Sequence, residues 1–102
     1  MAPHDVPIAR RSEIGVGTTK RVEIEHEAIL LCNVDGDMYA IEDVCTHDGG
    51  ELDQGELEEC RVVCPRHGAS FDVRSGAATL PAILPVRTFA VRLVGDDIFI
   101  DP

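Results

Sequence analysis

The chain of 102 residues contains no tryptophan, one tyrosine and three phenylalanines, so its core must be mainly aliphatic. No apolar run approaches the length that spans a membrane, and the N-terminus shows no signal-peptide pattern. These absences predict a soluble cytoplasmic protein with no membrane partner. In that compartment, four cysteines more often indicate metal or redox chemistry than disulfides.

Basic residues are also scarce, because nine Lys and Arg stand against 19 Asp and Glu and the formal net charge is -10. Nucleic acids carry negative phosphates that bind Lys and Arg, so an excess of acidic residues argues against a nucleic-acid partner. An acidic surface can steer encounters with a basic protein patch, or it can simply keep the chain soluble. The length fits one domain over residues 1–102.

Long amphipathic helices are absent from the pattern, and at most the segment DQGELEE allows a helical turn. Short runs rich in Val and Ile, separated by Gly or Asp, predict strands instead. Ala28–Val34 and Met38–Glu42 form the arms of a hairpin joined by Asp35-Gly36, a dipeptide that accepts the positive φ of tight turns. A second hairpin turns near Gly95-Asp96.

Between the hairpins, the segments RVVC and SFDV predict two short strands around a turn. The segment ATLPAILPV carries Pro81 and Pro85 and should therefore be an extended, irregular loop. We expect an all-β, antiparallel sandwich or barrel with one insertion, at about residues 43–72. That insertion contains three of the four cysteines and two of the four histidines.

Two mixed Cys-His pairs lie in this insertion, Cys45 with His47 in CTHDGG and Cys64 with His67 in CPRHGA. Thiolate and imidazole ligands suit borderline or soft metal ions. A structural Cys₂His₂ zinc site and a Rieske [2Fe–2S] cluster both take these four residues. Zinc sites usually draw on C-x₂₋₄-C and H-x₃₋₅-H units, whereas mixed pairs suit a cluster with two Cys on one iron and two His on the other.

With these motifs the chain resembles Rieske-type [2Fe–2S] ferredoxins, over nearly its whole length. The resemblance implies that Cys45 and Cys64 bind one iron and that His47 and His67 bind the other. It also implies stacked antiparallel sheets with the cluster at one tip, covered by a Pro-containing loop at Pro81–Pro85.

The resemblance further implies a one-electron carrier that is not an enzyme by itself. It would be a monomer, taking electrons from an NAD(P)H-dependent flavoprotein ferredoxin reductase and passing them to a terminal non-haem iron oxygenase. A ferredoxin-like subunit of another reductase complex is the nearest alternative. A structural zinc module that binds a protein is the alternative from a different class.

A sister branch, the Rieske proteins of cytochrome bc type, has a disulfide between the loops where this chain has Gly50 and Arg66. It also has a Ser and a Tyr, which hydrogen-bond near the cluster, where this chain has Ala69 and Phe71. Fewer donors to sulfur stabilise the reduced state less. We therefore expect a midpoint potential of about −150 mV, the low end of the Rieske range.

For the other cysteines and histidines, and for several residues near the cluster segment, we expect no role in ligand binding. Cys32 is expected to be a small buried thiol, and Cys60 to be neither a fifth ligand nor half of a disulfide. His4 and His26 are expected to be exposed without a role. Leu52 and Phe71 are expected to pack under the cluster, whereas the segment ELDQGELEE is either a docking patch or a solvated loop. Arg66 either guides a partner or fills the turn.

Overall fold

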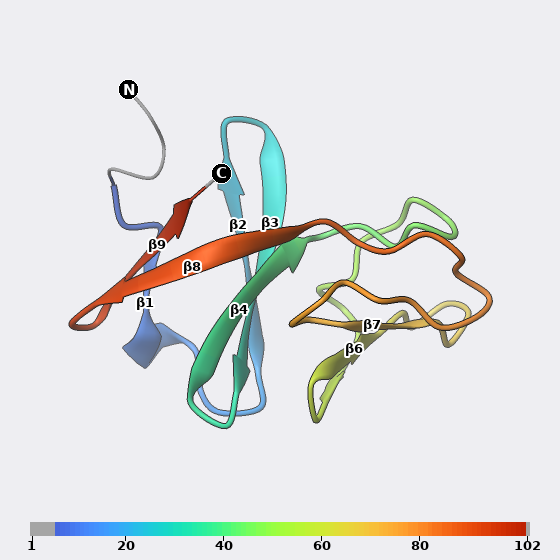
Figure 1. The fold of residues 1–102 in the computed structure, drawn as a ribbon, viewed down its shortest axis with the longest axis horizontal. Coiled ribbons are helices and arrows are strands. Elements are labelled where there is room, and N and C mark those ends of the chain that lie inside the picture. Colours follow the sequence, from blue (N-terminus) through green and yellow to red (C-terminus); the bar gives the residue numbers. More distant parts are fainter. Residues whose placement is uncertain (1–5, 102) are drawn as a thin grey trace.

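The computed structural model describes residues 6–101, and within them nine strands form two antiparallel sheets (Figure 1). The larger sheet has the order β1-β9-β8-β4-β3-β2 and the smaller has the order β5-β6-β7. The bounds are β1 Ala9–Arg10, β2 Thr19–Ile24, β3 Glu27–Val34, β4 Asp37–Glu42, β5 Leu57–Glu58, β6 Arg61–Val63, β7 Ser70–Asp72, β8 Thr88–Val94 and β9 Asp97–Asp101, with a short 3-10 helix at Arg11–Glu13.

Both predicted hairpins are confirmed. Strands β3 and β4 pair from Val34 opposite Asp37, and the two residues between them have φ of 54° and 96°, as a tight turn requires. Strands β8 and β9 pair from Val94 opposite Asp97, which places the second turn at Gly95-Asp96. Each turn is a local signal, so the sequence located both accurately.

The apolar run of β3 is explained by burial on both faces of the strand. Leu30 and Cys32 belong to a core cluster shared with the smaller sheet and the loops that follow it. Ile29 and Leu31 point the other way, into a cluster that includes residues of β8 and β9. The larger sheet thus curls around one core and packs a second core against the smaller sheet, forming a barrel-like all-β fold.

The segment DQGELEE, for which the sequence allowed at most a helical turn, forms no helix. Its residues form turns followed by β5, in which Leu57 pairs with Val62 of β6. Pairing with a neighbouring strand half-buries Leu57 and leaves Glu56, Glu58 and Glu59 exposed, which outweighs the helix propensity of the glutamates. In residues 6–101 no helix has the length and apolar character needed to span a membrane.

Candidate metal centre

Two loops at one end of the molecule carry the four predicted donors, and they share one backbone design. In the first, the Cys45 carbonyl accepts from Gly49 N at 2.7 Å and the Cys45 N donates to Gly50 O at 2.7 Å. In the second, the Cys64 carbonyl accepts from Gly68 N at 3.0 Å and the Cys64 N donates to Ala69 O at 2.7 Å. We call these two segments, residues 45–50 and 64–69, the metal loops.

Each metal loop turns back at a glycine in the left-handed region. Gly49 has φ of 75° and Gly68 has φ of 77°, four residues after the respective cysteine. Only glycine adopts this conformation without strain, so the C-x₃-G spacing common to both loops explains why they fold alike. The two cysteines are consequently presented in equivalent positions.

The donors separate by kind. Cys45 and Cys64 are buried within the core cluster, whereas His47 and His67 are exposed. The two imidazole rings meet edge to face, with centroids 4.8 Å apart and an interplanar angle of 82°. The structure therefore brings all four predicted residues together, with the sulfur atoms on the inside and the imidazoles on the outside.

Backbone N–H groups surround both sulfur atoms. The N–H groups of His47 and Asp48 point at the Cys45 sulfur, but burial is the larger effect and raises the pKa of that thiol. Burial also acts to raise the pKa of Cys64, yet this pKa is lowered. The N–H groups of Arg66 and His67 and the Cys45 thiol donate to its sulfur, and together with the Arg66 charge they outweigh burial. A thiolate, the form that binds metal, is thus stabilised here.

The distances between the donor atoms indicate whether one zinc ion or a two-iron cluster fits this site. Two groups of possible donor atoms lie within 4.8 Å of one another. One group contains the sulfurs of Cys45 and Cys64 and an oxygen of Asp48, and the other contains a nitrogen of His47, a nitrogen of His67 and an oxygen of Asp48. Within residues 6–101, no such group of donors combines a thiol with an imidazole. A tetrahedral zinc ion needs all four donors at roughly 3.5 Å from one another. The donor set fits two metal ions, one on sulfur and one on nitrogen, better than one.

Arg66 and Asp48 join the two metal loops. The Arg66 Nε donates to Asp48 Oδ2 at 2.6 Å, and an Arg66 terminal nitrogen donates to Asp48 Oδ1 at 3.2 Å. Hydrogen bonding from Arg66 holds the pKa of the Asp48 carboxyl well below its usual range. The same carboxylate has an oxygen 3.4 Å from His67 Nε2.

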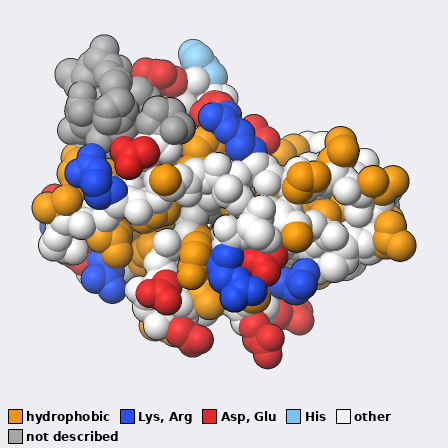
Figure 2. Space-filling view, in the orientation of Figure 1, with side chains coloured by type: hydrophobic (Ala, Val, Ile, Leu, Met, Phe, Trp, Pro, Cys, Tyr) orange, Lys and Arg blue, Asp and Glu red, His pale blue; other side chains and the backbone are white. Residues whose placement is uncertain are grey.

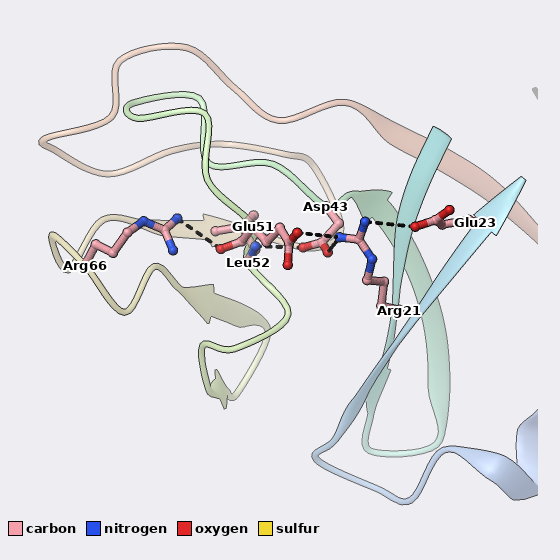
Figure 3. A network of polar contacts seen from close by, with 6 residues as sticks. All are labelled: Arg21, Glu23, Asp43, Glu51, Leu52 and Arg66. Atoms are coloured by element: carbon pink, nitrogen blue, oxygen red, sulfur yellow. Dashed lines mark hydrogen bonds and ion pairs between the residues drawn. The ribbon is translucent and has the colours of Figure 1, made fainter. Parts of the chain in front are cut away.

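A buried carboxylate fastens the first metal loop to the larger sheet (Figure 3). Asp43 accepts from the backbone N of Leu52 at 2.7 Å and from Arg21 of β2 at 2.5 Å. Arg21 also pairs with Glu23 at 3.1 Å and lies 3.7 Å from Glu51. Because the Asp43 side chain is fully shielded from solvent, this contact fixes where the loop leaves the sheet.

The Pro-containing loop lies against the metal loops, as expected. The Thr46 hydroxyl donates to the carbonyl of Leu84 at 2.6 Å, and Ala82 is buried in the core cluster. Leu80, Ile83 and Leu84 are instead exposed, the first two by 80% and 83%. Figure 2 shows hydrophobic side chains gathered at this end of the molecule, on the side where Figure 1 places this loop.

The other candidates occupy the places expected of them. Cys32 is fully buried, and burial raises its pKa to about 12. Cys60 is half-buried with its sulfur 3.8 Å from Asp72, outside the donor groups, and all four cysteines are unpaired. His26 is exposed in the turn between β2 and β3, whereas His4 lies outside the described residues. Leu52 and Phe71 are fully buried in the cluster that contains both metal-loop cysteines.

The sequence did not reveal the roles of Asp48 and Asp43. Carboxylates are common in polar loops, so Asp48 alone carries little signal, and its partner Arg66 lies in the other metal loop. Asp43 has no comparable signal, because its partners come from β2 and from beyond the first metal loop.

Comparison with known proteins places this fold and site in a family. The Rieske [2Fe-2S] domain model matches residues 4–90. The biphenyl 2,3-dioxygenase ferredoxin component of Rhodococcus jostii (strain RHA1) is 43% identical over 95 residues, which are 92% of this chain and 89% of that protein.

Two solved structures are also similar. The ferredoxin of carbazole 1,9a-dioxygenase from Nocardioides aromaticivorans IC177 superposes with a TM-score of 0.90 at 31% identity, covering 95% of this chain and 96% of that chain. A complex of reduced oxygenase and oxidized ferredoxin in carbazole 1,9a-dioxygenase contains a chain with a TM-score of 0.87 at 28% identity. That match covers 93% of this chain and 90% of the other.

The chain therefore belongs to the Rieske [2Fe–2S] family. It is a Rieske ferredoxin that carries one cluster, an electron-transfer component rather than a catalytic enzyme. The cluster supplies one-electron redox chemistry when bound, and the protein supplies the ligands, the N–H groups around them and the burial.

Proposed function

We propose that Cys45, His47, Cys64 and His67 are the cluster ligands, with the two cysteines on one iron and the two histidines on the other. One observation carries this proposal, the division of the donors into a buried pair of thiols and an exposed pair of imidazoles. Residues 1–102 then form a single Rieske domain, with the cluster-binding loops at about 43–72.

The exposed histidines suggest where electrons enter and leave. His47 and His67 are exposed, and Thr46, next to His47, contacts the loop that carries the exposed Leu84, so a partner that covers this end approaches the imidazoles directly. The buried cysteines face the core and offer no comparable route. Electron exchange through the histidine end is thus the arrangement that the side chains favour.

The partners that we propose are a flavoprotein ferredoxin reductase as donor and the terminal oxygenase of a dioxygenase system as acceptor. The oxygenase is supported by the solved complex of a similar ferredoxin with its oxygenase and by the name of the biphenyl relative. We also propose a monomer in the cytoplasm, where a reducing environment suits four unpaired cysteines.

The test of the ligand set combines metal analysis with spectroscopy of the purified protein and its Cys45→Ser, Cys64→Ser, His47→Gln and His67→Gln variants. The wild type is expected to contain two irons per chain and to bleach in the visible range on addition of dithionite. Each ligand variant is expected to lose the cluster, whereas His26→Gln and Cys60→Ser retain it. A cluster that survives any of the four ligand substitutions unchanged would exclude that residue.

The partner assignment is tested separately, with the reductase and oxygenase components of the biphenyl dioxygenase system as probes. NADH and that reductase should reduce the protein under anaerobic conditions, and the oxygenase should then reoxidise it. Reduction without reoxidation would favour the alternative of a subunit that serves a different reductase complex.

A further inference from the structure

We propose that Arg66 and Asp48 form an ionic cross-link between the two metal loops, and that it holds the loops together around the metal centre. This role goes beyond ligand binding and rests on the proposed ligand set. Neither residue would contact iron, so both are positioning residues.

The first support is the geometry of the guanidinium. Arg66 binds both oxygens of Asp48, at 2.6 Å and 3.2 Å, and also donates to the carbonyl oxygen of Glu51 at 3.0 Å. One side chain of the second metal loop thus makes three hydrogen bonds to the first metal loop and the residue that follows it. Bidentate pairs of this kind are more directional than a single lysine contact.

The second support is the space above Gly50. A Cβ atom added to Gly50 would lie 2.6 Å from the Arg66 Cζ and 2.6 Å from a terminal nitrogen, too close for any real contact. Gly50 does not have a positive φ, so its backbone conformation does not demand glycine. The absent side chain instead makes room for the guanidinium across the loop.

The third support is the position of Asp48 within the donor set. Its carboxylate lies within 4.8 Å of both cysteine sulfurs and also within 4.8 Å of both imidazoles. Without Arg66, this negative charge would face two thiolates in a partly buried setting, where like charges repel. Arg66 therefore closes the two loops at the centre of the donor set and neutralises the carboxylate.

The test compares how fast the visible chromophore is lost to EDTA under anaerobic conditions at pH 7. Arg66→Met and Asp48→Asn are each expected to lose the cluster about threefold faster than the wild type, a modest effect for a half-exposed pair. The double variant should be no faster than the faster single variant. Gly50→Ala should behave like Arg66→Met, because it displaces the guanidinium and leaves both charged residues in place.

Two further variants separate the cross-link from a general loss of structure. Arg66→Lys keeps the charge and should restore part of the retention. Arg87→Met removes an exposed ion pair with Glu27, which involves neither metal loop, and should decay at the wild-type rate. The EPR lines of the reduced cluster should broaden in Arg66→Met and Gly50→Ala, because the loops then sample more geometries.

The proposal is overturned if Arg66→Met retains the cluster as well as the wild type, or if the two single effects multiply in the double variant. A double-mutant cycle in urea unfolding of the same proteins measures the coupling whether or not metal is bound, and a coupling of zero also overturns it. A colourless wild type would instead contradict the ligand set, so the two failures are distinguishable.

Discussion

The buried carboxylate of Asp72 is stabilised in its ionised form by Arg74. Asp72 ends β7 and is buried, but its carboxylate accepts from the backbone N of Arg74 at 2.8 Å and from the Arg74 side chain at 2.9 Å and 3.1 Å. Hydrogen bonding from the Arg74 side chain is the main reason that the pKa of Asp72 is lowered from 3.8 to about 2.

This lowered pKa predicts how stability depends on pH. Because the folded pKa lies below the unfolded value, Asp72 stabilises the fold above about pH 4, and this contribution is lost as pH falls towards 2. Asp72→Asn should cost about 1–2 kcal/mol at pH 7 and progressively less below pH 4. Urea unfolding between pH 7 and pH 2.5 measures this, with the half-exposed Asp101→Asn as control. A difference that stays constant with pH would contradict the prediction.

Ala69 is the residue at which we expect the midpoint potential to be set low. Its side chain is fully buried in the same core cluster as Cys64, and its carbonyl accepts the Cys64 N–H at 2.7 Å. A serine there would add a hydroxyl donor close to the sulfur, which stabilises the reduced state. The low potential expected from the sequence follows from the absence of such a donor.

Ala69→Ser should therefore raise the midpoint potential by roughly 20–60 mV, the equivalent of one hydrogen bond in a one-electron couple. An EPR-monitored redox titration measures the change. Ala40→Ser places the same substitution in the other core cluster and should leave the potential unaltered. A wild-type potential well above zero, or an unchanged value in Ala69→Ser, would contradict this account.

At the scale of elements, the sequence predicted what is encoded locally. The turn at Asp35-Gly36 and the loop containing Pro81 and Pro85 were found because each depends on neighbouring residues. The two-residue strands β1 and β5 were missed, since they exist only through pairing with β9 and β6. A pattern two residues long carries no periodicity from which to recognise them.

The metal loops show the same division. Their four candidate donors were predicted from the spacing within each loop, and the structure brings the two thiols together and the two imidazoles together. The contact between Arg66 and Asp48 joins residues 18 apart in sequence and depends on how the two loops face each other. The contact of Asp43 with Leu52 likewise depends on how the chain turns back after the first metal loop, which local sequence does not specify.

Asp43 anchors the first metal loop to the larger sheet, so removing its charge should destabilise the fold. Asp43→Asn keeps an acceptor for the Leu52 N–H but removes the charge that faces Arg21, so we expect a loss of about 1–3 kcal/mol in unfolding free energy. Glu23→Gln removes the exposed partner of the same arginine and should cost less than about 1 kcal/mol. Urea unfolding of both variants measures the contrast, and equal costs would contradict the anchoring role.

At the scale of the whole molecule, hydrophobic side chains gather at one end of the face in Figure 2, and charged side chains lie elsewhere on that face. His47 and His67 are exposed, and so are Ile83 and Leu84 of the Pro-containing loop, in a chain with a formal net charge of -10. Long-range attraction to a basic partner and short-range apolar contact at the histidine end can therefore act together. This combination suits brief encounters with more than one protein.

The central claim is that the imidazoles of His47 and His67 bind the same iron. Pulsed EPR of the dithionite-reduced protein, labelled with ¹⁵N-histidine, tests it most directly. The account predicts two strongly coupled imidazole nitrogens in the wild type and in His26→Gln. A spectrum with one coupled nitrogen, or with none, would contradict the claim.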